Sequence, residues 1–192
     1  MAKDLMVGSA GLLGCEESIA SFLLPRGLEI ELSTWLRRPD TIAEISCLNG
    51  ATVVEFLRHA VRLEGYADEN AGLAAGADGK LKWKNLPWWD NSLWLPREFG
   101  NPGGLDDVPT FFIGSCQGLV AELDELKRIS ALRLGEVPTA YSDMRKDFLQ
   151  FVRSDRELDL SAEDGIRWVW RALREGAELA IAQDAALWAG PD

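Results

Sequence analysis

The amino-acid sequence predicts a mainly α-helical fold: a single helical domain with minor β structure and a long ordered loop rich in Trp, Pro and Gly. Two stretches of the chain, residues 51–64 and the C-terminal half, carry apolar residues at helical spacing. The region 66–113 between them is dense in residues that break helices. A chain of 192 residues is long enough for one domain with a real core and short for two.

The N-terminal part predicts one short helix and one ambiguous segment. Residues 10–24 form a short helix candidate, which Pro25 and Gly27 stop. Residues 28–32 alternate between apolar and charged side chains, as a strand does, but they also fit one face of a helix. Both assignments of 28–32 therefore stay open.

The next segment contains two helix signals. Thr41 and Glu44 have the spacing of a capping box, which predicts the start of a short helix. Val53 and Leu57 begin a run of apolar residues at helical spacing. The second pattern predicts a helix over 51–64.

The region 66–113 predicts an ordered loop. It contains four of the eight tryptophans, whereas a disordered linker is poor in aromatic residues. Long ordered loops inside a domain are often functional. The tryptophans of this loop are Trp83, Trp88, Trp89 and Trp94.

Three helices are predicted in the C-terminal half, over 116–134, 139–153 and 162–188. Ser161 has the residue type and position of an N-cap for the third and longest helix. The apolar stripe of that helix is wider than one face, which predicts packing on two sides.

Composition excludes several classes of function. The formal net charge is −11, so nucleic acid would be repelled, whereas a basic protein partner would be attracted. No apolar run reaches the roughly 18 residues that a membrane-spanning helix needs. The first residues do not resemble a secretory signal, which predicts a cytoplasmic protein.

Metal and cofactor sites have no support in the sequence. The three cysteines, Cys15, Cys47 and Cys116, are not spaced as zinc ligands or as a disulfide framework, and His59 is the one histidine. No P-loop and no dinucleotide-binding glycine motif is present. We therefore expect neither a metal nor a cofactor.

The pattern Gly114-x-Cys116-x-Gly118 follows an apolar, β-prone run and precedes a helical pattern. This layout can hold a cysteine nucleophile on a tight strand-to-helix turn, where the helix start lowers the pKa of the thiol. The pattern resembles the nucleophile turn of α/β-hydrolases, but those enzymes need a histidine downstream, and none follows Cys116.

The segment Phe111–Gly118 also resembles the cysteine signature of caspase-like proteases, and His59 lies upstream as that signature requires. However, Gly114 and Ser115 replace the expected Gln-Ala, and His59 falls inside a predicted helix. A small, buried Cys116 in a tight turn is the favoured interpretation, and a hydrolase that uses Cys116 with His59 is the enzymatic alternative.

Carboxylate pairs offer a further enzymatic route, because general acid–base chemistry needs two carboxyl groups in unequal environments. Neighbouring carboxylates on a helix usually form a solvated face, and this is the favoured interpretation. The candidates are Asp106 with Asp107, Glu122 with Asp124 and Glu125, and Glu163 with Asp164.

The tryptophan-rich loop can be interpreted as a binding surface. Trp and Arg dominate the energetics of protein interfaces, because large side chains bury much area. Two alternatives stay open: the rings cover the helical core, or they line a sugar- or peptide-binding cleft. The predicted partner-binding residues are Trp83, Trp88, Trp89, Trp94, Arg97, Asp90, Asp106 and Asp107.

Two segments, Phe112–Leu126 and Ile166–Ala177, are similar to small bacterial immunity proteins encoded beside polymorphic toxins. The similarity lies in a Gly-Ser-x-x-Gly-Leu helix start and a Trp-rich last helix. The resemblance implies a protein that inactivates one cognate toxin by binding it, with no chemistry of its own. The charge of −11 fits a basic toxin such as a nuclease.

Overall fold

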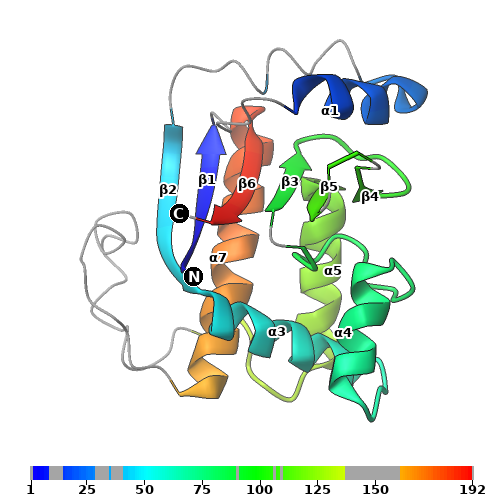
Figure 1. Ribbon diagram of the computed structural model, residues 1–192. Coiled ribbons are helices and arrows are strands. Elements are labelled where there is room, and N and C mark those ends of the chain that lie inside the picture. Colours follow the sequence, from blue (N-terminus) through cyan, green and yellow to red (C-terminus); the bar gives the residue numbers. More distant parts are fainter. Residues whose placement is uncertain are drawn as a thin grey trace.

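A six-stranded mixed sheet forms the centre of the molecule, with the strand order β2-β1-β6-β3-β5-β4 (Figure 1). Strands β3 and β5 are parallel, and the other neighbouring pairs of this sheet are antiparallel. The strands are β1 (Ala2–Gly8), β2 (Thr41–Asn49), β3 (Asn91–Leu95), β4 (Gly103–Gly104), β5 (Phe111–Ser115) and β6 (Ala186–Pro191). This computed structural model describes residues 2–8, 15–28, 35, 41–89, 91–105, 107–108, 110–136 and 161–191.

Helices cover both faces of the sheet (Figure 1). One face packs against α7 with its neighbours α3 and α5, and the opposite face packs against α1. The helices are α1 (Glu16–Leu23), α3 (Gly50–Leu63), α4 (Glu69–Ala77), α5 (Cys116–Ile129) and α7 (Ala162–Gln183), and a 3₁₀ turn, η1 (Leu24–Arg26), follows α1.

The central strands are apolar on both faces because each face has its own helical layer. In β3, Leu93 and Leu95 belong to the core beneath α1, whereas Trp94 between them belongs to the core beneath α7. Successive side chains of a strand point to opposite faces, so an apolar residue at every position is what a doubly covered sheet requires.

The prediction of a mainly α-helical fold is wrong, and the chain has an α/β fold. The strands β3 and β5 are buried almost throughout, so they lack the alternation of apolar and polar residues that reveals a strand. Both strands are also short, Asn91–Leu95 and Phe111–Ser115, which makes them harder to recognise as strands from the sequence.

Two further strands replace predicted helical segments. The capping-box pattern at Thr41 lies in β2, where Ala43 and Ile45 pair with Val7 and Leu5 of β1. The helix predicted over 162–188 ends at Gln183. Residues 184–185 connect it to β6, and residues 186–188 are the first three of that strand. In both places, pairing with strands distant in sequence outweighs a local helical pattern.

The predicted loop over 66–113 contains regular structure. It includes α4, all of β3 and β4, and the start of β5. The side chain of Asp68 caps α4 by accepting hydrogen bonds from the N–H groups of Asn70 and Ala71, at 3.0 and 3.2 Å. The interpretation of this region as one long loop is therefore wrong.

The other predicted helices have clear counterparts. The helix predicted over 51–64 is α3, and the one predicted over 116–134 is α5, which ends at Ile129. The segment 10–24 contains α1, and the helix predicted over 139–153 lies outside the described residues. None of the described helices is long and apolar enough to cross a membrane.

Candidate functional site

The turn between β5 and α5 is built by close packing around two glycines. A Cβ atom at Gly114 would lie 2.7 Å from Cδ1 of Trp94, and one at Gly118 would lie 2.5 Å from Nδ2 of Asn85. The hydroxyl of Ser115 caps α5 by accepting a hydrogen bond from the N–H of Gly118 at 3.1 Å. Packing and capping therefore explain the small residues of this turn.

Cys116, the first residue of α5, is a core residue. Its side chain is 0% exposed, and burial raises the pKa of the thiol well above its usual range, although a hydrogen bond with the backbone of Leu187 acts in the opposite direction. A cysteine nucleophile needs the opposite shift in pKa and access to a substrate.

His59 lies in α3 and contacts the other end of α5. Its Nε2 is 2.8 Å from Oγ of Ser130, the residue that follows the last turn of α5. Cys116 and Ser130 are separated by the whole helix, which spans roughly 20 Å at a rise of about 1.5 Å per residue. Cys116 and His59 therefore do not form a catalytic pair in this structure.

Glu122, which the sequence suggests is a solvated helix residue, instead joins α5 to the segment before β3. Its carboxylate accepts hydrogen bonds from the backbone N–H groups of Lys84 and Asn85, both at 2.8 Å. The amide of Asn85 also donates to Glu122, at 2.9 Å. Burial raises the pKa of Glu122 to about 7, although these donors lower it.

The same network continues from Asn85 to the β5–α5 turn. The side-chain oxygen of Asn85 accepts a hydrogen bond from the N–H of Ser115 at 2.9 Å, and the backbone oxygen of Asn85 accepts one from Nε1 of Trp94 at 2.6 Å. No local sequence signal links Asn85 and Glu122, which are far apart along the chain. The sequence alone therefore does not predict this network.

Two of the four loop tryptophans belong to the core. Trp83 is 2% exposed and Trp94 is 0% exposed, so neither can contact a partner in this conformation. Their assignment to a binding surface is corrected: they cover the helical core, which was the alternative interpretation.

Trp88 and Trp89 are partly buried. The indole N–H of Trp88 donates to the backbone oxygen of Trp83 at 2.6 Å, and the Trp88 ring packs against Gly76 of α4. The ring of Trp89 lies beside Gly104 of β4 and lines a pocket. Trp89 is therefore the loop tryptophan best placed for contact with a ligand or partner.

The charged residues of the predicted surface are dispersed. Arg97 forms an ion pair with Asp184 at 2.6 Å, and its guanidinium lies 5.4 Å from the centre of the Trp35 ring. Asp107 is exposed and accepts a hydrogen bond from the hydroxyl of Ser18 at 2.6 Å. Asp90 and Asp106 lie outside the described residues.

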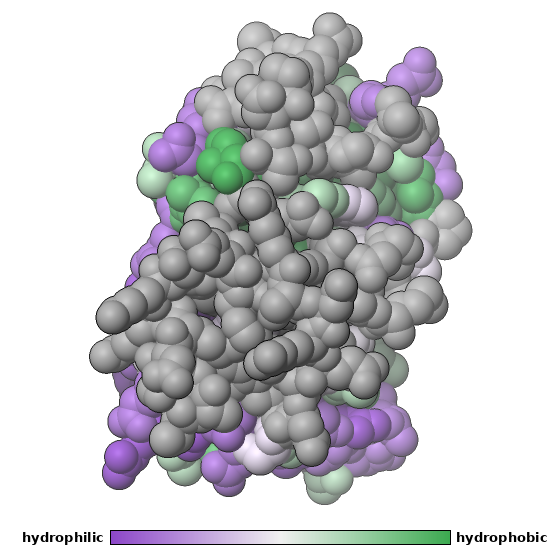
Figure 2. Space-filling view, turned by 90° about the vertical axis from the view of Figure 1, so that its left-hand side faces the viewer, coloured by the Kyte–Doolittle hydropathy of each residue, from purple (hydrophilic) through white to green (hydrophobic). Residues whose placement is uncertain are grey.

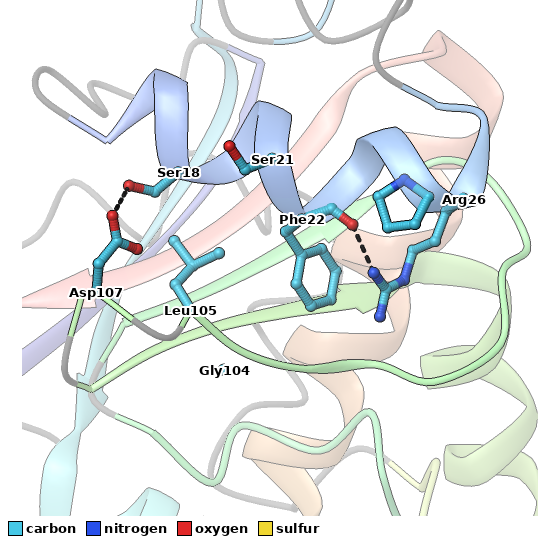
Figure 3. A pocket seen from close by; sticks show the side chains of 8 residues that line it. Ser18, Ser21, Phe22, Arg26, Gly104, Leu105 and Asp107 are labelled. Atoms are coloured by element: carbon cyan, nitrogen blue, oxygen red, sulfur yellow. Dashed lines mark hydrogen bonds between the residues drawn. The ribbon is translucent and has the colours of Figure 1, made fainter.

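A pocket of about 380 Å³, here called the α1 pocket, lies between α1 and the residues around β4. Figure 3 shows Asp107 and Ser18 at one end, Arg26 at the other, and Leu105 and Phe22 between them. The full lining is Ser18, Ser21, Phe22, Pro25, Arg26, Gly104, Leu105 and Asp107.

A second pocket of about 430 Å³, here called the α4 pocket, lies between the end of α4 and residues 101–104. Its lining includes the apolar groups of Trp89, Pro102 and Phe112. Gly104 lines both pockets, so β4 separates them. The candidate site is this strand with its two flanking pockets.

The described residues contain no group of three potential metal ligands. Comparisons of the chain with protein-family models, with curated proteins and with solved structures gave no match.

Proposed function

We propose that this chain is a non-enzymatic binding protein that inactivates a cognate bacterial toxin by direct contact, and that the toxin is basic. The observation that carries the proposal is the net charge of −11 together with the way the basic side chains are used. A strongly acidic protein attracts a basic partner over long distance and accelerates their association.

Arginines of the described helices are tied to carboxylates of the same chain. In α7, Arg167 pairs with Asp164 at 3.0 Å and Arg171 pairs with Glu175 at 2.5 Å. Arg174 pairs with Asp124 of α5. Because these cations are neutralised locally, the excess of carboxylates determines the field that an approaching partner meets.

Hydrophilic residues also gather at the lower end of the face shown in Figure 2. The first turn of α7, which holds Glu163 and Asp164, begins at the lower end of the molecule in Figure 1. Glu163 and Asp164 share one cation, Arg167, so this turn keeps an excess negative charge that suits an electrostatic encounter, whereas a firm contact needs apolar area as well. Trp89 supplies such area beside β4.

The two segments that resemble immunity proteins are in contact with each other. Phe112–Leu126 includes most of β5 and α5, and Ile166–Ala177 lies in α7. The indole N–H of Trp170 donates to the backbone oxygen of Leu123 at 2.8 Å. The resemblance therefore concerns one packed unit, and this supports the proposal.

The test uses the protein encoded by the neighbouring gene, because immunity genes lie beside their toxin genes. We expect the two purified proteins to form a complex whose association rate falls steeply as salt rises, since exposed charges are screened within about 10 Å at 0.1 M. We also expect co-expression of this chain to restore the growth of cells that make the neighbour's product. Absence of both the complex and the protection would refute the proposal.

A further inference from the structure

Strand β4 has one edge that pairs with β5 and one edge that faces away from the sheet. Gly103 pairs with Ile113 and Gly104 with Phe112, and the N–H of Leu105 donates to the backbone oxygen of Phe111 at 3.1 Å. Antiparallel residues alternate between hydrogen-bonded and non-hydrogen-bonded pairs. The N–H and C=O of Gly104 therefore point away from β5, and no described residue bonds to them.

The α1 and α4 pockets lie on opposite faces of this edge. A Cβ atom at Gly103 would be 4.0 Å from the ring of Phe22 in the α1 pocket. One at Gly104 would be 3.6 Å from the ring of Trp89 in the α4 pocket. Side chains at the two positions would thus point to opposite sides of β4, as strand geometry requires, whereas the backbone of Gly104 lines both pockets and that of Gly103 lines the α4 pocket.

We propose that the free edge of β4 is the docking site for an extended segment of the basic protein partner. The segment adds a strand beyond β4, with a Lys or Arg side chain in the α1 pocket and an apolar side chain against Trp89 in the α4 pocket. Main-chain hydrogen bonds to Gly104 supply affinity, and the two pockets supply selectivity. This inference rests on the proposed function, because it names the contact that the partner makes.

The charges of the α1 pocket determine which side chain it takes. The carboxylate of Asp107 accepts a hydrogen bond from Ser18, and within the described residues no cation pairs with it. Arg26 is directed elsewhere: its guanidinium donates to the backbone oxygens of Phe22 and Asn101, at 2.5 and 2.9 Å. The Asp107 end is therefore negative, and a basic side chain complements it.

The α4 pocket has a mixed lining of polar and apolar groups, in which the ring of Trp89 is the apolar surface that a side chain can contact. Trp89, Pro102 and Phe112 contribute its apolar surface. Asp78 and Lys84 also line it: the Asp78 carboxylate is paired with Lys80 at 2.6 Å, and Lys84 is exposed, so its ammonium can stay in water. An aliphatic or aromatic side chain that lies against Trp89 buries the apolar area of this ring.

A matched pair of substitutions at Gly104 tests the main-chain contact. Gly104→Pro removes the outward N–H but no hydrogen bond of the β4–β5 ladder, which suits proline on an edge strand. Gly104→Ala keeps the N–H, and its Cβ meets Trp89 at ordinary contact distance. We expect Gly104→Pro to weaken binding of the neighbouring gene's product by roughly tenfold or more, and clearly more than Gly104→Ala, which keeps the N–H.

The side-chain chemistry is tested with two acetylated and amidated hexapeptides, Lys-Val-Lys-Val-Lys-Val and Glu-Val-Glu-Val-Glu-Val. We expect the lysine peptide to slow hydrogen exchange of the Gly104 amide and the glutamate peptide to leave it unchanged. Asp107→Asn retains an oxygen that can accept from Ser18 but removes the charge. This variant should lose most of the protection that the lysine peptide gives.

The outcomes separate this inference from the proposed function. If the neighbour's product binds the wild type and Gly104→Pro equally well, the β4 site is wrong and the proposed function stands. If that product does not bind at all, the proposed function fails, and unchanged Gly104 exchange at saturating lysine peptide overturns the β4 site as well. A wild-type dimer that Gly104→Pro converts to a monomer would assign the edge to a second copy, which also overturns the inference.

Discussion

The β5–α5 turn and the β4 edge both combine two glycines with a tryptophan, yet they differ in how closely the ring approaches the glycine. At the turn, a Cβ at Gly114 would lie 2.7 Å from Trp94, which is closer than packed atoms tolerate. At the edge, a Cβ at Gly104 would lie 3.6 Å from Trp89, which is ordinary contact. Gly114 and Trp94 pack together in the core, whereas Gly104 and Trp89 border an open pocket.

This difference shows why glycine and tryptophan together do not identify a binding surface. In the turn, the absence of a side chain lets Trp94 and Asn85 reach the backbone, and the result is stability. At the edge, the absence of side chains leaves two pockets open beside the N–H and C=O of Gly104, to which no described residue bonds. The same residue types thus serve packing in one region and border open pockets in the other.

The largest expected effect separates the two tryptophans. Trp94→Ala removes a fully buried ring and its hydrogen bond to Asn85, so we expect the free energy of unfolding to fall by about 3–5 kcal/mol. Trp89→Ala should cost clearly less, because this ring is partly exposed beside a pocket. Urea unfolding of both variants measures the difference, and equal losses would abolish the distinction between the turn and the edge.

Glu122 gives the turn region a characteristic pH dependence. Its pKa is raised from 4.5 to about 7 in the folded protein, so between these values the folded state holds a proton that the unfolded chain has released. The free energy of unfolding therefore falls as pH rises through this window, by up to about 3 kcal/mol.

Glu122→Gln removes this titration, and unfolding of both proteins from pH 4.5 to 8 tests it. We expect the stability of the wild type relative to the variant to fall as pH rises. His59 has a lowered pKa, so its contribution to the free energy of unfolding is lost as pH falls below 6.5. Because His59 is present in both proteins, this contribution cancels when their unfolding free energies are subtracted. If the difference in unfolding free energy between the two proteins does not vary with pH, Glu122 does not have a raised pKa in the folded protein.

Local patterns predicted helices better than strands. The helix α3 shows one apolar face, which includes Val53, Phe56 and Ala60, and this periodicity is visible in the sequence. The strands β3 and β5 are buried on both faces, so no periodicity distinguishes them. The order of the strands depends on pairing between distant segments, such as Met6 with Trp188, which local patterns do not record.

The candidate site shows the same limit. The sequence located the tryptophan-rich region, but the exposure of each ring depends on how it packs in the folded chain, where Trp94 is fully buried and Trp89 is partly exposed. Gly103 and Gly104 predicted a loop, and their edge position follows only from their pairing with Ile113 and Phe112. Composition therefore indicates the region that contains the candidate site, and strand pairing determines which residues of that region are exposed there.

A smaller effect distinguishes the two sets of glycines. Gly114→Ala forces Trp94 or Phe112 to move, so we expect a loss of roughly 1–3 kcal/mol in the free energy of unfolding. Gly104→Ala should change stability by no more than about 0.5 kcal/mol, because its Cβ meets no atom too closely. Thermal and urea unfolding measure both variants, and a comparable loss at Gly104 would show that the edge is packed as tightly as the turn.

The smallest expected effect concerns the thiol at the turn. Because Cys116 is fully buried with a raised pKa, alkylation at pH 7 should be much slower than that of the partly exposed Cys15, as measured by mass spectrometry of the labelled peptides. His59→Ala should leave the rate at Cys116 unchanged, apart from any increase that follows lower stability. Ser130→Ala controls for that increase, since it removes the same hydrogen bond and keeps the imidazole. If Cys116 is labelled rapidly below pH 7, and only His59→Ala slows this labelling, then Cys116 is a reactive thiol activated by His59. The turn would then be an active site and not a packing element.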